Sequence, residues 1–263
     1  MPGITGLSNM NTTIGIDRVQ TVVERLVAVV RANAVVSGVA VAAVLGTAWM
    51  IHDYKEWRAL GTGGTPPNVF GYCRMTISRI VFAYHIPRQT DPNTLSNNGP
   101  SYIKASIPLR SGGRPKIMPR ILPQRQVPEP IDPLVKEKLM SLMRRLASKH
   151  PDILETRPSH TEGGTADGLY ARKDNGKINP IVVSDRALDY EIAHAHPRDN
   201  SLHLWLSEAD ARKVIEARWG QRFCVPTVQK GWTMVYAPRN EEELELIEEF
   251  VKAGVRWVTG VAI

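Results

Sequence analysis

Residues 191–207 read EIAHAHPRDNSLHLWLS, and this stretch decides the fold that we expect for the C-terminal half of the chain. Two short runs of alternating side chains flank PRDN, a segment of turn formers, so the pattern predicts a β-hairpin. In that pairing His194 lies opposite His203. Because strand side chains alternate between two faces, His194, His196 and His203 then share one face. The leucines of the second strand take the opposite face, which we expect to pack in the core.

Helix and strand signals on both sides of the hairpin extend this prediction to a whole domain. Asp132 followed by Pro133 is typical of a helix start, and Ser207 and Asn240 are N-cap residues of two further helices. Strands are predicted for GLYAR (168–172), PIVVSD (180–185) and WTMVYAPR (232–239). This order predicts an α+β fold, with a single mixed or antiparallel sheet covered by helices.

The N-terminal quarter contains an uncharged apolar run. Residues 32–51 read ANAVVSGVAVAAVLGTAWMI, which as a helix would span about 30 Å, the hydrocarbon thickness of a bilayer. Trp49, Tyr54 and Trp57 stand near its C-terminal end, and such aromatic residues favour the membrane interface. We interpret the run as a transmembrane anchor. A buried helix of a soluble protein and a cleaved signal peptide are the alternatives.

These signals divide the chain into four parts. We expect an N-terminal flank (1–31), a transmembrane anchor (32–51), a connecting region rich in proline, glycine and basic residues that packs on the domain (52–130), and the α+β core (131–263). Two cysteines give no disulfide framework, and the sole Asn-x-Ser/Thr acceptor, Asn11, precedes the anchor. We therefore expect a single-pass protein of an endomembrane, with its catalytic domain facing the cytosol.

Charge limits the partners that the chain is expected to have. The net charge is +7 and the pI is near 9.5, which is compatible with nucleic acid, an anionic membrane surface or an acidic small molecule. Neither an RNA-binding signature of aromatic and basic residues nor a zinc-finger spacing occurs, so we expect no nucleic-acid partner. A membrane and an acidic small molecule remain.

The histidine face has three interpretations. The histidines could be structural and simply hydrogen-bonded, or His194, His196 and His203 could bind a metal, since imidazole suits zinc, iron and copper. No carboxylate ligand is expected on that face, because Glu191 is predicted to point to the other one. Histidine also titrates near neutral pH and can take a proton from an acidic substrate. We expect acid–base catalysis by these three residues and no metal, with the three-histidine metal site as the alternative.

An acidic substrate would need an apolar wall and a positive charge. Trp232 and Tyr236 alternate along the strand predicted after the hairpin and could supply that wall. Four arginines could hold a substrate oxyanion through charge-assisted hydrogen bonds: Arg114 and Arg125 in the connecting region, Arg222 in WGQR, and Arg239 after the strand. The alternative for these residues is an ordinary one, with the aromatic rings in the core and the arginines on the solvated surface.

A set of short motifs runs along almost the whole chain. The anchor is followed by DYKEW, PPNVFGY, GGRPKI and PQRQ, and then by EIAHAH, LHL, WGQR and YAPRNEEE. In these motifs, their order and their spacing, the chain resembles the fungal luciferases and the wider fungal family of luciferase-domain proteins. The resemblance implies a membrane-anchored oxygenase that oxidises a hydroxypyrone or phenolic substrate, such as 3-hydroxyhispidin, with light emission in the luminous members.

The resemblance also bears on cofactors. It implies O₂ as co-substrate and no flavin, haem or nicotinamide, and no G-x-G-x-x-G motif follows a predicted strand. A deprotonated, electron-rich hydroxypyrone can itself donate an electron to O₂, so that the protein has to remove the proton, hold the anion and exclude water. Histidines in a pocket with nearby arginines suit that task.

One position departs from the family pattern. The family usually reads W-G-x-R-H-P-L where this chain reads WGQRFCVP, so Phe223 replaces a histidine. We expect Phe223 to belong to the substrate site, and the chain to oxidise its substrate with or without light emission. The alternatives are a non-luminous relative that acts in secondary metabolism, a binding module without turnover, and the three-histidine metalloenzyme.

Overall fold

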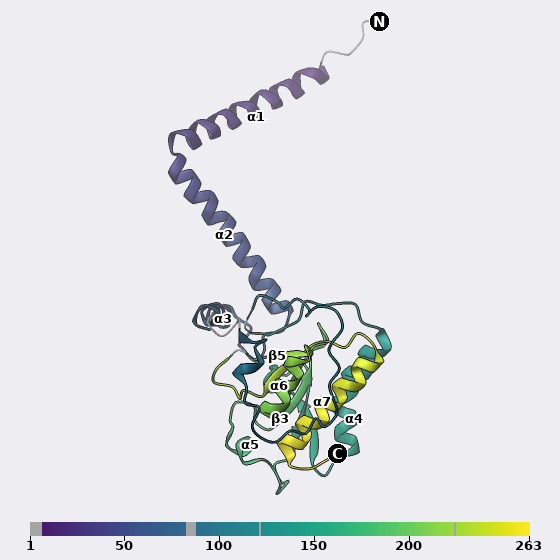
Figure 1. Ribbon diagram of the computed structural model, residues 1–263. Coiled ribbons are helices and arrows are strands. Elements are labelled where there is room, and N and C mark those ends of the chain that lie inside the picture. Colours follow the sequence, from purple (N-terminus) through teal and green to yellow (C-terminus); the bar gives the residue numbers. More distant parts are fainter. Residues whose placement is uncertain (1–6, 83–87, 121, 224) are drawn as a thin grey trace, which may run out of the picture. The chain divides into compact units, whose positions relative to one another are not determined.

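The computed structural model describes residues 7–82, 88–120, 122–223 and 225–263 and falls into two units, Met1–Lys55 and Glu56–Ile263. The first unit holds helix α1 (Leu7–Ala32) and most of helix α2 (Ala34–Ala59), both drawn in purple and blue in Figure 1. Among the described residues α2 is the helix long and apolar enough to cross a membrane, with a mean hydropathy of 2.1 and no buried side chain in that window. It covers most of the apolar run noted in the sequence.

The second unit is built on one sheet. Its six strands lie in the order β1-β2-β3-β4-β6-β5, and each neighbouring pair is antiparallel. The strands are β1 (Leu154–Pro158), β2 (Asp167–Ala171), β3 (Glu191–Ala195), β4 (Leu202–Trp205), β5 (Gly220–Arg222) and β6 (Trp232–Val235). The expected α+β class with an antiparallel sheet is therefore confirmed.

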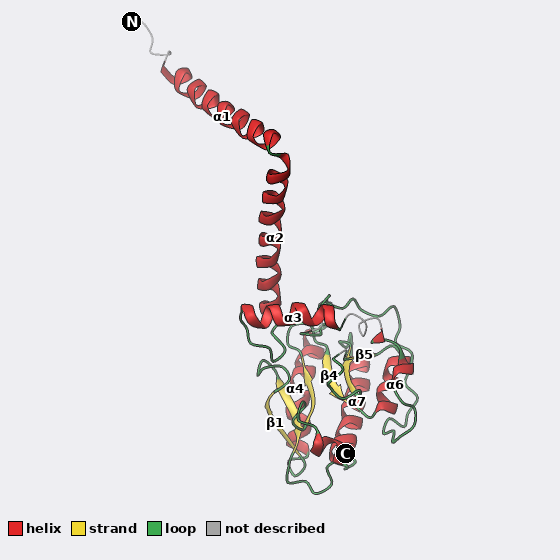
Figure 2. Ribbon diagram, turned by 90° about the vertical axis from the view of Figure 1, so that its left-hand side faces the viewer, coloured by secondary structure: helices red, strands yellow, loops and turns green. Residues whose placement is uncertain are grey.

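The second unit also contains helices, three of which begin at the N-cap residues that the sequence predicts. They are α3 (Val69–Val81), a short 3-10 turn η2 (Pro92–Thr94), α4 (Pro133–Lys149), α5 (Pro180–Ser184), α6 (Glu208–Glu216) and α7 (Glu241–Thr259). Asp132, Ser207 and Asn240 cap α4, α6 and α7 through their side chains. In both ribbon views α4 and α7 run side by side (Figures 1 and 2), and both contact the sheet.

One predicted strand is wrong. The segment PIVVSD forms helix α5, because Asn179 caps its first turn and Pro180 occupies the first helical position. Its short apolar run fits either type of element, and the two residues before it carry the helix signal.

The hairpin forms as predicted. His194 pairs with His203, and the backbone N–H of His196 donates to the carbonyl of Ser201 at 2.8 Å. On the other face Leu204 packs against α7, where a Cβ atom added to Gly254 would lie 2.7 Å from a leucine methyl carbon. The helix thus covers the leucine face, and the histidine face is left for the loops that bring in the rest of the site.

Candidate functional site

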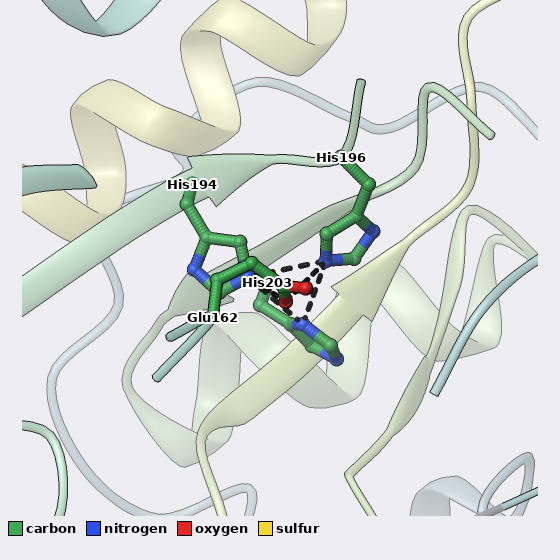
Figure 3. Close-up of side chains that lie close together, drawn as sticks. All are labelled: Glu162, His194, His196 and His203. Carbon is green, nitrogen blue, oxygen red and sulfur yellow. Dashed lines mark hydrogen bonds and ion pairs between the residues drawn. The ribbon is translucent and has the colours of Figure 1, made fainter. Parts of the chain in front are cut away.

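The three hairpin histidines point their rings at one spot (Figure 3). Nε2 of His196 lies 3.1 Å from Nε2 of His194 and 3.1 Å from Nδ1 of His203, and the remaining pair is 3.3 Å apart. All three side chains are buried, with at most 4% exposed. The sequence prediction that they converge is confirmed, and the structure adds that their nitrogen atoms form a nearly equilateral triangle.

A fourth residue of the cluster, Glu162, was missed from the sequence. Its Oε2 lies 3.4 Å from His194 Nε2 and 3.7 Å from His196 Nε2, and its side chain is 3% exposed. Glu162 stands in the loop between β1 and β2, where Gly163 and Gly164 adopt positive φ values of 66° and 81°. Such glycines permit a tight turn, so the sequence Glu162-Gly163-Gly164 could have indicated that Glu162 lies in a turn.

Glu191 also lies on the histidine side of the sheet, which corrects the prediction that it points to the other face. The register between β2 and β3 shifts at Leu169 and Tyr170, so that Ile192 is an extra residue in a β-bulge. The bulge reverses the alternation, and Glu191 Oε1 comes within 2.8 Å of His194 Nδ1.

Each histidine has one ring nitrogen that points away from the centre of the triangle, and this outer nitrogen has a hydrogen-bond partner. His194 Nδ1 meets the Glu191 carboxylate, His196 Nδ1 lies 2.8 Å from Ser201 Oγ, and His203 Nε2 lies 3.1 Å from Gln124 Oε1. The Ser201 hydroxyl donates its one hydrogen to Asp199 at 2.5 Å. These partners fix the orientation of all three rings.

Burial and neighbouring charges separate the pKa values of the three rings. For His194, burial opposes protonation, but hydrogen bonds to Glu162 and Glu191 outweigh it and raise the pKa to about 9. Burial lowers the pKa of His196 well below its ordinary value, and the Arg125 charge adds to that effect. Burial likewise lowers the pKa of His203, with the charge of His194 as a further cause. Near neutral pH and without an ion, the cluster therefore holds one proton more than three neutral rings would, and that proton is on His194.

A cavity of about 300 Å³ opens against the cluster. It is lined by His194, His203, Glu162 and by three residues that the sequence suggested for substrate binding: Arg125, Phe223 and Trp232. The Trp232 ring stacks on His203 with ring centroids 5.7 Å apart and planes at 14°, and the Phe223 ring meets His203 edge-on at 5.3 Å. These rings form an aromatic wall beside the basic nitrogen atoms.

The other four predicted substrate residues do not line this cavity. Arg114 donates to the carbonyls of Gly220 and Ile215, at 2.9 Å each, and so supports the fold. Arg239 pairs with Glu243 at the start of α7.

Tyr236 is fully buried, and its hydroxyl donates to Gln221 at 3.2 Å. Arg222 contributes its carbonyl, which accepts from Gln124, the partner of His203. Sequence patterns identify such residues by type, but only the folded loops show which of them face the cavity.

The buried cluster has two chemical capabilities. His196 and His203 stay neutral, because burial lowers their pKa values, and a neutral imidazole can act as the base that takes a proton from a substrate in the cavity. Glu162, His194, His196 and His203 could also hold a metal ion, because one ligand atom from each lies within 4.8 Å of the others.

Comparison with known proteins identifies close likenesses over most of the chain. A family model described as "Luciferase domain" matches residues 189–254, which contain the histidine hairpin. The luciferase of Neonothopanus nambi is 30% identical over 243 residues, covering 87% of this chain and 88% of that protein. The luciferases of Armillaria gallica and Armillaria mellea are 29% and 28% identical, each covering 84% of this chain. No solved structure matches the chain.

Proposed function

This chain belongs to the fungal luciferase family, and on that premise we propose that it is an oxygenase that uses O₂ to oxidise a small acidic hydroxypyrone or phenol such as 3-hydroxyhispidin. The observation that carries the proposal is the cavity of about 300 Å³ with buried histidines on one wall and aromatic rings on another. A cavity of that size and mixed lining is typical of small-molecule sites. Light would be emitted only if the product forms in an electronically excited state, and photon counting in the same assays measures it.

The proposed reaction requires the site to deprotonate the substrate and to hold the resulting anion. Loss of a proton makes a hydroxypyrone electron-rich, so that the anion can pass one electron to O₂. The substrate radical and superoxide then combine to a peroxide, in which both partners' electrons are accounted for. Because water would stabilise the anion and compete for the peroxide, a closed apolar cavity favours the reaction.

The described residues suit these roles. His194, His196 and His203 form the catalytic centre, which promotes proton loss from the substrate. Arg125 lines the cavity and supplies a positive charge beside it. Trp232 and Phe223 offer flat apolar surfaces on which a planar ring can lie.

Oxygen uptake by the purified full-length protein tests this proposal. The protein is mixed in air with 3-hydroxyhispidin, other hydroxypyrones and catechols, and O₂ consumption, substrate loss and photons are recorded together. We expect O₂ and one acidic substrate to disappear in equal amounts. Tight binding of every candidate without O₂ uptake would instead identify a binding module.

Residue 223 should tune this activity. The Phe223→His variant is expected to raise turnover on hydroxypyrones by at least about tenfold, or about 1.4 kcal/mol of barrier, because it adds a proton-accepting ring inside the cavity. The measurement is kcat/KM from O₂ uptake, with Phe223→Leu as the matched control that keeps the wall apolar. A folded histidine variant no faster than the leucine variant would contradict this role.

We further propose that α2 anchors the protein in an endomembrane, that the connecting region 52–130 belongs to the catalytic domain, and that this domain faces the cytosol. Support for the anchor comes from the apolar length of α2 and from α3, which begins ten residues after α2 ends. On α3 the side chains of Phe70, Ile77 and Ile80 are 60–75% exposed, as expected of a helix that rests on a membrane surface.

Two positive charges in the middle of α2 should release the protein from the membrane. The variant Val41→Arg with Val44→Arg is expected to leave the membrane pellet on alkaline carbonate extraction, because each arginine costs about 2.5–3.5 kcal/mol at the centre of a span. Val22→Arg with Val23→Arg in α1 is the matched control and should stay in the pellet. A mature protein whose N-terminal peptides are missing by mass spectrometry would identify a signal sequence instead.

A further inference from the structure

We infer that Glu162, His194, His196 and His203 bind one divalent first-row transition-metal ion at the back of the cavity. This inference rests on the geometry of the buried cluster and does not depend on which reaction the protein performs. Its consequence for the mechanism, given last, rests on the proposed function.

Hydrogen bonds on the outer side of the rings decide where the lone pairs point. The Glu191 carboxylate can only accept, so His194 Nδ1 must donate to it. Ser201 gives its one hydrogen to Asp199, so its oxygen must accept from His196 Nδ1.

The same reasoning holds for His203. The amide nitrogen of Gln124 donates at 3.0 Å to two acceptors, Gln89 Oε1 and the carbonyl of Arg222. The amide oxygen of Gln124 therefore faces His203 Nε2 and accepts its hydrogen. Once an ion displaces the extra proton of His194, all three rings are neutral and carry their hydrogen on the outer nitrogen. Three bare lone pairs then point at one spot, which is the arrangement that outer partners impose on metal-binding histidines.

The spacing of those inner nitrogens suits an ion. Their separations of 3.1, 3.1 and 3.3 Å match ligands held at about 2.0–2.1 Å from one centre, since tetrahedral ligands at that bond length lie about 3.3 Å apart. The Oε2 atom of Glu162 stands on the cavity side as the fourth donor, and its other oxygen is held by Arg125. Three imidazoles and one carboxylate favour zinc, iron, copper or nickel over magnesium or calcium.

The excess of buried negative charge around the rings also favours binding of a cation. Around the three rings lie the carboxylates of Glu162, Glu191 and Asp199 and the guanidinium of Arg125, each at most 3% exposed. In the ion-free protein Arg125 and the extra proton on His194 offset two of these three negative charges, so one stays uncompensated in a buried site, where that is costly. A divalent ion that displaces the His194 proton would, together with Arg125, balance all three carboxylates.

Arg125 is the competing cation of the ion-free protein. Its Nη1 lies 3.1 Å from His196 Nε2 and also donates to the carbonyl of Gln124 at 3.0 Å. Because His194 carries a proton in the ion-free protein, two inner lone pairs remain, and the guanidinium hydrogen meets the one on His196. With the ion bound, we expect Arg125 to give up His196 and to keep its bonds to Gln124 and Glu162.

If the proposed function holds, the ion changes the role of the histidines from bases to ligands. A substrate hydroxyl that coordinates a divalent cation loses its proton more readily, as metal-bound water does. Residues Glu162, His194, His196 and His203 would hold the ion, which would favour the substrate anion, and the proton would be released to water instead of to an imidazole.

Metal analysis of the full-length protein tests the inference. The protein is purified in detergent with a tag that contains no histidine, and its transition metals are measured by mass spectrometry. We expect close to one ion per chain. After chelator treatment, Co²⁺ that binds at the site should give visible d–d absorption. It should also raise Tm, because an ion that binds only the native state stabilises it.

Variants locate the ion. His194→Gln and Glu162→Gln should lose the Co²⁺ absorption, and Ser201→Ala, which removes the partner of His196, should weaken Co²⁺ binding by about 10–100-fold. His150→Gln, at the end of α4, is the matched control and should bind as the wild type does. Circular dichroism establishes that each variant is folded.

The outcomes separate the two proposals. A wild-type protein that holds no transition metal, gains no absorption or stability from Co²⁺, and consumes O₂ after chelation would overturn the metal inference and keep the proposed function. A stoichiometric ion without O₂ uptake on any substrate would do the reverse.

Discussion

Turnover by the His203→Gln variant is expected to fall about 10²–10⁴-fold below that of the wild type, the contribution typical of a positioned group that moves a substrate proton. His203 lines the cavity, stacks on Trp232 and lies within 3.3 Å of both neighbouring imidazoles. Glutamine keeps a polar side chain of similar reach, but it offers neither a basic ring nitrogen that can take a substrate proton nor an imidazole ligand.

The measurement is kcat from O₂ uptake on the best substrate found, for each of the three histidine variants in turn. His150→Gln again serves as the control for a histidine substitution outside the cluster. If His194→Gln, His196→Gln and His203→Gln were all folded and all turned over at near wild-type rates, the cluster would be structural and the catalytic assignment would be lost.

Replacing Arg125 with methionine should lower the free energy of unfolding by about 3–5 kcal/mol, the usual cost of removing one partner of a buried ion pair. Arg125 is 2% exposed, bonds to Glu162 and lies 3.7 Å from Asp199. Methionine fills much of the volume of the side chain, so that the expected loss comes from the carboxylates that remain buried without their partner.

Urea unfolding followed by tryptophan fluorescence measures this loss. Arg239→Met is the matched control, since Arg239 pairs with Glu243 nearer the surface, where an ion pair contributes about 0–1 kcal/mol. Equal losses in the two variants would contradict the assignment of Arg125 to the buried charge cluster. An unchanged stability with a raised KM would make Arg125 a substrate ligand alone.

The sequence predicts the frame of this site better than its contents. Alternation in two short runs was enough to place His194 opposite His203, because a hairpin fixes register through its loop. Capping residues such as Asp132 located the helices for a similar reason, since their signal is local.

The predictions that failed concern residues whose position depends on irregular backbone or on contacts between segments far apart in the sequence. Glu191 faces His194 because of a bulge, which breaks the alternation on which the prediction relied. Glu162 arrives from a loop about thirty residues before the hairpin, and local periodicity carries no information about such an approach. Arg114 and Arg239 look like anion-binding arginines in sequence, yet they bond to carbonyls and to Glu243.

If the proposed function holds, O₂ is consumed at the histidine cluster. The most direct measurement compares initial rates of O₂ consumption by wild-type protein and by His203→Gln, with 3-hydroxyhispidin and the related hydroxypyrones and catechols. The account predicts catalytic uptake by the wild type, equal to the substrate lost, and a rate at least about 100-fold lower in the folded variant. Equal uptake by both proteins, or none by the wild type with any of these substrates, would contradict it.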